Sequence, residues 1–170
     1  DCYRGSEDDV LERYYQAAVN FNVEKFYILY GDEPFTDIEL MLSTFKKMNK
    51  NKLHFVDNSN CIDGTFGYGM TFKTIEYIKE KKTSNNNEVW GNYVKSLSDL
   101  IVIESKFKQE ILKIRLTIDY QEDFVVIKSI FEALHPINPN FTLEDMLKLI
   151  ENNPKWAKIN AHVEQKKYLE

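Results

Sequence analysis

The apolar residues of this chain recur at two spacings along its first half, and each spacing predicts a different element. Apolar positions three and four residues apart predict helices, and uninterrupted aromatic and β-branched runs predict strands that are buried on both faces. The predicted order is a helix capped by Ser6, a strand over 25–30, a helix opened by a capping box over 36–39, a strand over 53–58, a glycine-rich loop over 62–69 and a helix over 72–82.

The second half repeats the alternation less regularly. Its pattern predicts a short helix over 88–95, strands over 100–107 and 111–119, a helix over 124–134 that Pro136 ends, and a helix that Thr142 opens with Asp145 and that ends before Pro154. Helices that alternate with strands are typical of an α/β layer fold, so we expect a mostly parallel sheet.

The composition sets limits on size and partners. A chain of 170 residues with 43% hydrophobic content can bury one ordinary core, which predicts a single domain over 1–170. The net charge of -5 argues against general binding to nucleic acid. No apolar run approaches the roughly 20 residues that span a bilayer, so we expect a cytoplasmic protein without a membrane partner. The two cysteines and three histidines have no metal-site spacing and are expected to be structural.

Asp32 is the first candidate for chemistry. It follows the predicted strand over 25–30, between Gly31 and Pro34, which would hold its carboxylate at the rim of the sheet. In open α/β sheets ligands bind beyond the carboxyl ends of the strands. Asp32 is therefore expected to face a ligand crevice.

Asp119 occupies an equivalent place at the end of the strand predicted over 111–119, and Asp123 lies in the first turn of the next helix. If Asp32 and Asp119 face the same crevice, two carboxylates about 4 Å apart would repel by roughly 4 kcal/mol at an effective dielectric near 20. A divalent cation would remove that penalty, and oxygen ligands completed by water and phosphate suit Mg²⁺. The alternative is that Asp32 and Asp123 are turn and cap residues that coordinate nothing.

Four segments, in order along nearly the whole chain, resemble the cytidylyltransferase family, and within it the spore-coat polysaccharide branch related to the acylneuraminate and Kdo cytidylyltransferases. The match is weakest over 53–108. The segments are "RGSEDDVLERYYQAA" (Arg4 to Ala18), "GDEPF" (Gly31 to Phe35), "KIRLTIDYQEDF" (Lys113 to Phe124) and "NPNFTLEDMLKLIENNPKWAKINAHV" (Asn138 to Val163).

The resemblance implies a three-layer, Rossmann-like nucleotidyltransferase fold of the nucleotide-diphospho-sugar transferase type. It further implies transfer of a cytidylyl group from CTP to a sugar or sugar acid, with release of pyrophosphate, use of Mg²⁺, a homodimer and a role in surface polysaccharide synthesis. By the same resemblance Asp32 and Asp119 are the catalytic, metal-side residues. The implied nucleotide-side residues are Arg4, Gly31, Asp32 and Arg13, with a subunit interface or a solvated helix face as alternatives for the two arginines.

Three features depart from the family pattern. The glycine-rich loop that wraps the triphosphate would precede Asp1, so we expect an amino-terminally truncated domain, without its first strand and phosphate loop, that is inactive alone. Ile28 replaces an arginine that many relatives carry. The segment 63–68 lacks two acidic positions where relatives often read "DGLDVE", which leaves the sugar open. The carboxyl-terminal segment 138–170 is expected to be helical or irregular, without chemistry.

Two other functions remain as alternatives. One is a glycosyltransferase of similar fold, which would release a nucleotide and form a glycoside. The other is a non-catalytic fragment or dimerisation module. The aromatic residues of the middle segment could stack on a sugar ring or simply pack in the core; they are Phe66, Tyr68, Trp90 and Tyr93.

Overall fold

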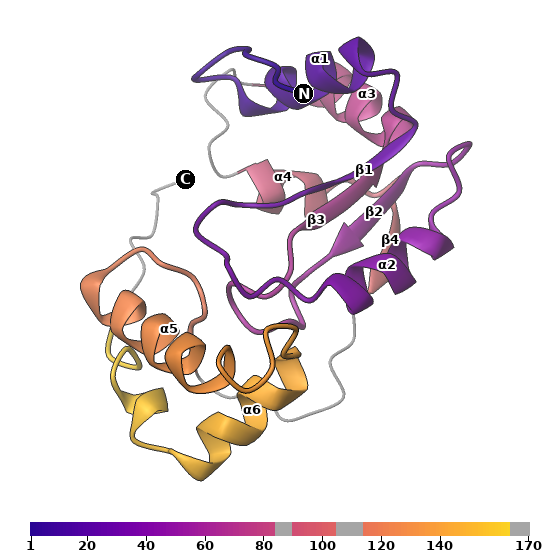
Figure 1. The fold of residues 1–170 in the computed structure, drawn as a ribbon. Coiled ribbons are helices and arrows are strands. Elements are labelled where there is room, and N and C mark those ends of the chain that lie inside the picture. The colour runs from indigo at the N-terminus through magenta and orange to yellow at the C-terminus, as the bar shows by residue number, and fades with distance from the viewer. Residues whose placement is uncertain (84–89, 105–113, 164–170) are drawn as a thin grey trace. The chain divides into compact units, whose positions relative to one another are not determined.

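The computed structural model describes residues 1–83, 90–104 and 114–163. The chain divides into two compact units (Figure 1). We call Asp1–Ile28, Met41–Asn58 and Tyr68–Ser105 the sheet unit, and Leu29–Leu40, Ser59–Gly67 and Lys106–Glu170 the acidic unit. The prediction of a single domain over 1–170 stays a prediction. Within the residues described, no helix is long and apolar enough to cross a membrane.

The sheet unit is built on four short strands in the order β1-β3-β2-β4. These strands are β1 (Lys25–Ile28), β2 (His54–Asp57), β3 (Tyr68–Thr71) and β4 (Ile101–Glu104). Strand β3 runs antiparallel to both β1 and β2, while β2 and β4 are parallel. The fold is therefore a mixed α/β fold, and the expectation of a mostly parallel sheet is not confirmed.

Strand β3 falls partly in the region that the sequence predicted to be a loop. Gly69 made this segment look like a loop in the sequence. The strand nevertheless needs glycine here, because a Cβ at this position would lie 2.7 Å from the Tyr27 ring and 2.9 Å from Val56 Cγ2. Only glycine lets the neighbouring side chains approach β3 so closely. Met70 then pairs with Phe55 of β2 and Phe26 of β1, and Met70 and Phe55 are fully buried.

Helices α1 (Val10–Asn20) and α3 (Phe72–Lys81) pack against each other in this unit (Figure 1). The amino terminus of α1 differs from the prediction, since Asp9 and not Ser6 is the cap. Asp9 Oδ1 accepts from the Glu12 backbone N–H (3.0 Å), and Ser6 Oγ accepts from the Asp9 N–H (2.9 Å). The unit also contains α4 (Trp90–Lys95) and most of α2 (Ile38–Lys47). The cap of α2 is Asp37 rather than Thr36, because Asp37 Oδ1 accepts a hydrogen bond from Leu40 N–H (2.9 Å).

The acidic unit contains α5 (Gln121–Leu134), α6 (Leu143–Asn152) and a 3-10 turn (Trp156–Lys158). The predicted capping box at the start of α6 is confirmed: Thr142 Oγ1 accepts from Asp145 N–H (3.2 Å) and Asp145 Oδ2 accepts from Thr142 N–H (2.9 Å). One cluster of buried apolar side chains joins the two helices to the loops of the unit. Its members are Phe35, Ile62, Ile114, Leu116, Val126, Ile127, Ile130, Leu143, Met146, Leu147 and Ile150.

The strand predicted over 111–119 is wrong for its described part. Residues 111–113 lie outside the described residues, and 114–119 form no strand. Instead, two of the backbone N–H groups in this segment donate to two different loops: Leu116 N–H to Asp63 O (2.8 Å) and Ile118 N–H to Asp32 O (2.9 Å). Because each loop accepts only one of these hydrogen bonds, the segment is held in place without forming a ladder.

Candidate functional site

The acidic unit brings the two aspartates that the sequence singled out to one place. The hydrogen bond from Ile118 to the Asp32 carbonyl places the segment that carries Asp119 against the loop after β1. The bond from Leu116 to the Asp63 carbonyl adds the loop after β2. Asp32 and Asp119 thus converge through an irregular segment and not, as predicted, through the ends of parallel strands.

The loop that carries Asp63 is shaped by a tight turn. Gly64 has a positive φ of 82°, and a Cβ on it would lie 2.3 Å from the Leu116 carbonyl carbon and the Thr117 nitrogen. Glycine is therefore required here both for its backbone conformation and for the close approach of the 114–119 segment. The Thr65 carbonyl also accepts from Asp37 N–H (2.8 Å), which ties this loop to the loop that carries Asp32.

Five carboxylates gather in this part of the unit, and we call them the acidic cluster: Asp32, Glu33, Asp63, Asp119 and Asp123. Burial, and then the charges of Asp32, Asp63 and Asp119, raise the pKa of Glu33 to about 7. Burial also raises the pKa of Asp63; its other acidic neighbours add to this, while the positive charge of Arg115 opposes it. Repulsion among like charges and desolvation both raise the pKa of a carboxyl group, as expected for carboxylates crowded into a partly buried site.

Arg115 supplies positive charge inside the cluster. Its Nη2 donates to Asp119 Oδ2 (2.6 Å) and to Asp123 Oδ2 (3.2 Å), and its side chain is only 13% exposed. The two carboxylates differ in their surroundings. The Asp119 side chain is 36% exposed and can reach a ligand, whereas the Asp123 side chain is completely buried.

Asp123 has the contacts of a structural residue. Its Oδ2 also accepts from the backbone N–H groups of Asp119 (3.2 Å) and Tyr120 (3.1 Å), which caps the start of α5. Its Oδ1 accepts from Asn160 Nδ2 (2.8 Å). Asp123 is therefore a cap residue, as the alternative hypothesis expected. Asp32, by contrast, is exposed to solvent.

The carboxylate oxygens of the acidic cluster are possible ligands for a metal ion. Among the described residues, no three His, Cys, Asp or Glu side chains are grouped so that they could hold a metal by themselves. Mg²⁺ usually takes one or two carboxylates and completes its shell with water and substrate phosphates. The accessible carboxylates of Asp32 and Asp119 fit that second arrangement, so the cluster suits a divalent cation that these two carboxylates hold and whose shell water completes until a phosphate replaces it.

The remaining predicted site residues are Arg4, Arg13 and Gly31. Arg4 and Arg13 belong to the sheet unit; Arg4 is exposed, and Arg13 Nη1 donates to the Ser6 carbonyl (2.8 Å). Gly31 precedes Asp32 in the acidic unit, but it has no positive φ and a Cβ there would meet nothing within 4 Å. The backbone therefore does not require a glycine at position 31.

Two of the four aromatic residues of the middle segment, Tyr68 and Trp90, pack against each other in the sheet unit. Trp90 is 3% exposed, and its ring lies 4.8 Å from the Tyr68 ring and 5.9 Å from the Tyr14 ring. The Tyr68 ring also stacks on the Phe55 ring at 5.6 Å. Core packing explains Tyr68 and Trp90 without a sugar.

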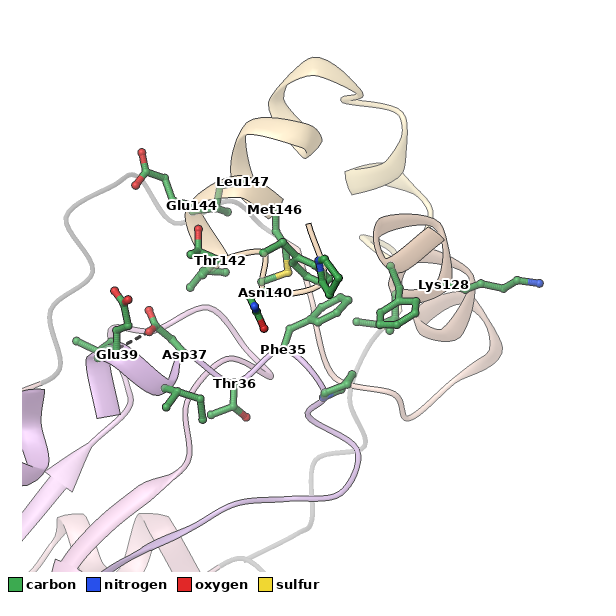
Figure 2. A pocket seen from close by; sticks show the side chains of 18 of the residues that line it. Phe35, Thr36, Asp37, Glu39, Lys128, Asn140, Thr142, Glu144, Met146 and Leu147 are labelled. Atoms are coloured by element: carbon green, nitrogen blue, oxygen red, sulfur yellow. Dashed lines mark hydrogen bonds between the residues drawn. The ribbon is translucent and has the colours of Figure 1, made fainter. Parts of the chain in front are cut away.

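A separate cavity of about 1010 Å³ lies within the acidic unit (Figure 2). Phe35, Asn140 and Met146 lie at its centre in the picture, with Asp37 and Glu39 on one side and Lys128 on the other. The rim charges are partly neutralised by neighbours, because Glu144 pairs with Lys148 (2.8 Å) and Lys128 with Glu132 (3.7 Å). The cavity thus presents mainly apolar surface and lacks the crowded carboxylates of the acidic cluster.

Sequence reasoning missed four residues of the site: Glu33, Asp63, Arg115 and Asn160. Glu33 follows Asp32 directly, and Arg115 lies four positions before Asp119. Asp63 precedes a glycine in a loop after a strand, a signal that could have been used. No local pattern marks Asn160, which reaches Asp123 across 37 positions of sequence.

Comparisons with known proteins add a family and a fold. No family model matches the chain. The uncharacterized protein MJ1063 of Methanocaldococcus jannaschii is 31% identical over 174 aligned positions, which cover all of this chain and 71% of the archaeal protein. The chain belongs to the family of that protein. This family membership supplies no activity, because the archaeal relative is itself uncharacterized.

A solved structure extends the comparison to the fold. The cytidylyltransferase from Leptospira borgpetersenii serovar Hardjo-bovis superposes with a TM-score of 0.82 at 22% identity, and the match covers 98% of this chain and 70% of that protein. The chain therefore has the fold of a cytidylyltransferase over nearly its whole length. The expected likeness to a cytidylyltransferase fold is confirmed, whereas a Rossmann-like fold with a mostly parallel sheet is not.

Proposed function

We propose that this chain belongs to a nucleotidyltransferase of the cytidylyltransferase type, which transfers the cytidylyl group of CTP to a hydroxyl of a sugar or sugar acid and releases pyrophosphate. The observation that carries the proposal is the convergence of Asp32 and Asp119 in a fold shared with a cytidylyltransferase. Fold alone does not specify chemistry. The crowded, partly buried carboxylates are what favour a site for a cation and its phosphates.

The residues divide into distinct roles. Asp32 and Asp119 would hold Mg²⁺ through carboxylate oxygens. Bound there, Mg²⁺ would neutralise charge on the phosphate oxygens during transfer. Arg115 keeps the Asp119 carboxylate in place through its 2.6 Å ion pair, so that less order has to be gained when substrate binds. Gly64 holds the Asp63 loop against the same segment.

The finer parts of the proposal rest on the sequence resemblance. They are the identity of CTP, the sugar or sugar-acid acceptor, a homodimer, and a role in surface polysaccharide synthesis as in the spore-coat branch. The aromatic cluster of the sheet unit offers no support for a particular sugar, since its members are engaged in packing.

The test is pyrophosphate release by the full-length protein from its natural source, with CTP, Mg²⁺ and a panel of sugars and sugar acids. Asp32→Asn should lower turnover at least a hundredfold, because it removes a metal-side charge while keeping the side-chain size. Glu144→Gln is the matched control; it makes the same carboxylate-to-amide change at an exposed position of α6, where Glu144 pairs with Lys148 (2.8 Å).

The products separate this proposal from its alternatives. A CMP-sugar with pyrophosphate supports it, whereas a glycoside with a released nucleotide would establish a glycosyltransferase. Full turnover by Asp32→Asn would refute the metal role of Asp32.

A further inference from the structure

Asn160 is a buried side chain that joins the carboxyl-terminal segment to the acidic cluster. It follows the 3-10 turn of the acidic unit and is 0% exposed. Its Nδ2 donates two hydrogen bonds, one to the backbone carbonyl of Arg115 (2.9 Å) and one to Asp123 Oδ1 (2.8 Å). Both amide protons are thus used to hold residues of the cluster.

These two contacts fix the groups that in turn hold Asp119. The second oxygen of Asp123 accepts from the Asp119 backbone N–H (3.2 Å), so Asp123 anchors the main chain of Asp119. The guanidinium of Arg115 donates to the Asp119 carboxylate (2.6 Å), so Arg115 anchors its side chain. Asn160 does not contact Asp119 itself; it contacts both of the residues that do.

This arrangement is energetically costly, which argues against simple packing. Among the described residues, three buried side-chain atoms have no hydrogen-bond partner, and two of them are Asn160 Oδ1 and Arg115 Nε. Leaving a buried polar atom unpaired costs about 1–3 kcal/mol. An apolar residue would avoid the unpaired oxygen at 160, but it could not donate to Asp123 and Arg115.

We infer that Asn160 is a positioning residue for the Asp119 carboxylate, acting through Asp123 and Arg115. The inference rests on the proposed function, since it assumes that Asp119 holds a divalent cation. Partners in the outer shell of a metal site commonly change affinity by about 10–100-fold when they are removed. Asn160 fits such a role because it orders both the backbone and the side chain of a candidate ligand.

The experiment measures Mn²⁺ binding to the full-length protein by electron paramagnetic resonance, without nucleotide. Asn160→Ala should raise the dissociation constant of Mn²⁺ about tenfold. Asn153→Ala is the matched control. It also removes an asparagine from the carboxyl-terminal segment, one whose Nδ2 donates to the Leu149 carbonyl (2.8 Å), and it should leave the constant within about twofold because its contact does not involve the cluster.

Thermal unfolding of each variant separates positioning from a loss of folded protein. A purely structural role would lower the melting temperature of Asn160→Ala and leave Mn²⁺ affinity per folded molecule unchanged, which would overturn the inference. If Asn160→Ala does not fold, Asn160→Leu keeps most of the buried volume without donating hydrogen bonds and carries the same expectation.

Asp119→Asn distinguishes failure of the inference from failure of the proposed function. If Mn²⁺ binding is insensitive to Asp119→Asn, the proposed metal site is wrong, and the role of Asn160 falls with it. If Asp119→Asn weakens binding but Asn160→Ala behaves like Asn153→Ala, only the inference is wrong.

Discussion

The two units of this protein differ in how completely their described buried polar groups are paired. In the sheet unit they are paired: Thr71 Oγ1 donates to the Lys52 carbonyl (2.7 Å), and Thr74 Oγ1 donates to the His54 carbonyl (2.8 Å). Three buried side-chain atoms of the described residues have no hydrogen-bond partner. All three lie in the acidic unit, on Glu33, Arg115 and Asn160.

This difference between the units indicates which of them contains destabilising features. Unpaired buried atoms and crowded carboxylates both lower the free energy of unfolding, and proteins tolerate such features mainly at functional sites. The sheet unit has the paired groups and dense apolar packing of a scaffold. The acidic unit has unpaired buried atoms and crowded carboxylates, as expected at a site, and mutations should therefore act differently in the two units.

The largest effect is expected from Asp123→Ala. The substitution removes a buried carboxylate that accepts from Arg115, Asn160 and two backbone N–H groups, all of which would lose a partner. Breaking a buried pair from one side costs about 3–5 kcal/mol. Urea unfolding followed by circular dichroism would measure it, and a loss below about 1 kcal/mol would show that the network is not the anchor described here.

A smaller loss is expected from Phe55→Leu in the sheet unit. Phe55 is fully buried against Tyr68 and Trp90, but the new side chain is also apolar and its neighbours can adjust. We expect a loss of about 1.5 kcal/mol in the same urea assay. A loss larger than that of Asp123→Ala would reverse the comparison between the units.

Glu33→Gln should stabilise the protein above neutral pH. The pKa of Glu33 is about 7 in the folded chain, above its ordinary value of 4.5, so the folded state favours the protonated form. The cost of charging Glu33 is absent below pH 4.5, grows between pH 4.5 and 7, and is complete above pH 7. A neutral glutamine avoids that cost.

Urea unfolding at two pH values tests this prediction. After allowance for solvent screening, the variant should gain on the order of 1 kcal/mol over the wild type at about pH 8 and nothing at about pH 4. A gain that is equal at both pH values would mean that charge is not its cause.

The smallest effect is expected from Lys50→Met in the sheet unit. Lys50 Nζ lies 2.6 Å from Glu24 Oε1, but the two side chains are 53% and 62% exposed. Exposed ion pairs contribute about 0–1 kcal/mol, so the free energy of unfolding should change by less than about 0.5 kcal/mol. A larger loss would show that surface charge contributes more to the sheet unit than its exposure suggests.

Much of the fold could be predicted from local pattern. The runs that became β1, β2 and β4, and the helices α3, α5 and α6, carry strong periodic or capping signals, such as Thr142 with Asp145. Strand β3 was missed because Gly69 reads as a loop residue, although its absent side chain is what admits Tyr27. The residues 114–119 were taken for a strand because their apolar character reflects burial, while their hydrogen bonds go to separate loops.

The site was predictable only in part, because some of its features depend on residues that are far apart in the sequence. Strand ends and turn residues pointed to Asp32 and Asp119. Asn160 contacts Arg115 across 45 positions, and the raised pKa of Glu33 depends first on burial and then on the charges of three carboxylates from three segments. Such features arise from tertiary contacts, which a single sequence does not display.

The central claim is that the acidic cluster binds a divalent cation, and a titration of Mn²⁺ into the ¹⁵N-labelled protein tests it most directly. Paramagnetic broadening identifies the amides nearest to the ion. We predict that the amide signals of Asp32, Asp63 and Asp119 disappear first, at substoichiometric Mn²⁺. Loss of the signals around Glu144 and Asp145 on α6 before those of the cluster, or uniform loss across the chain, would contradict the claim.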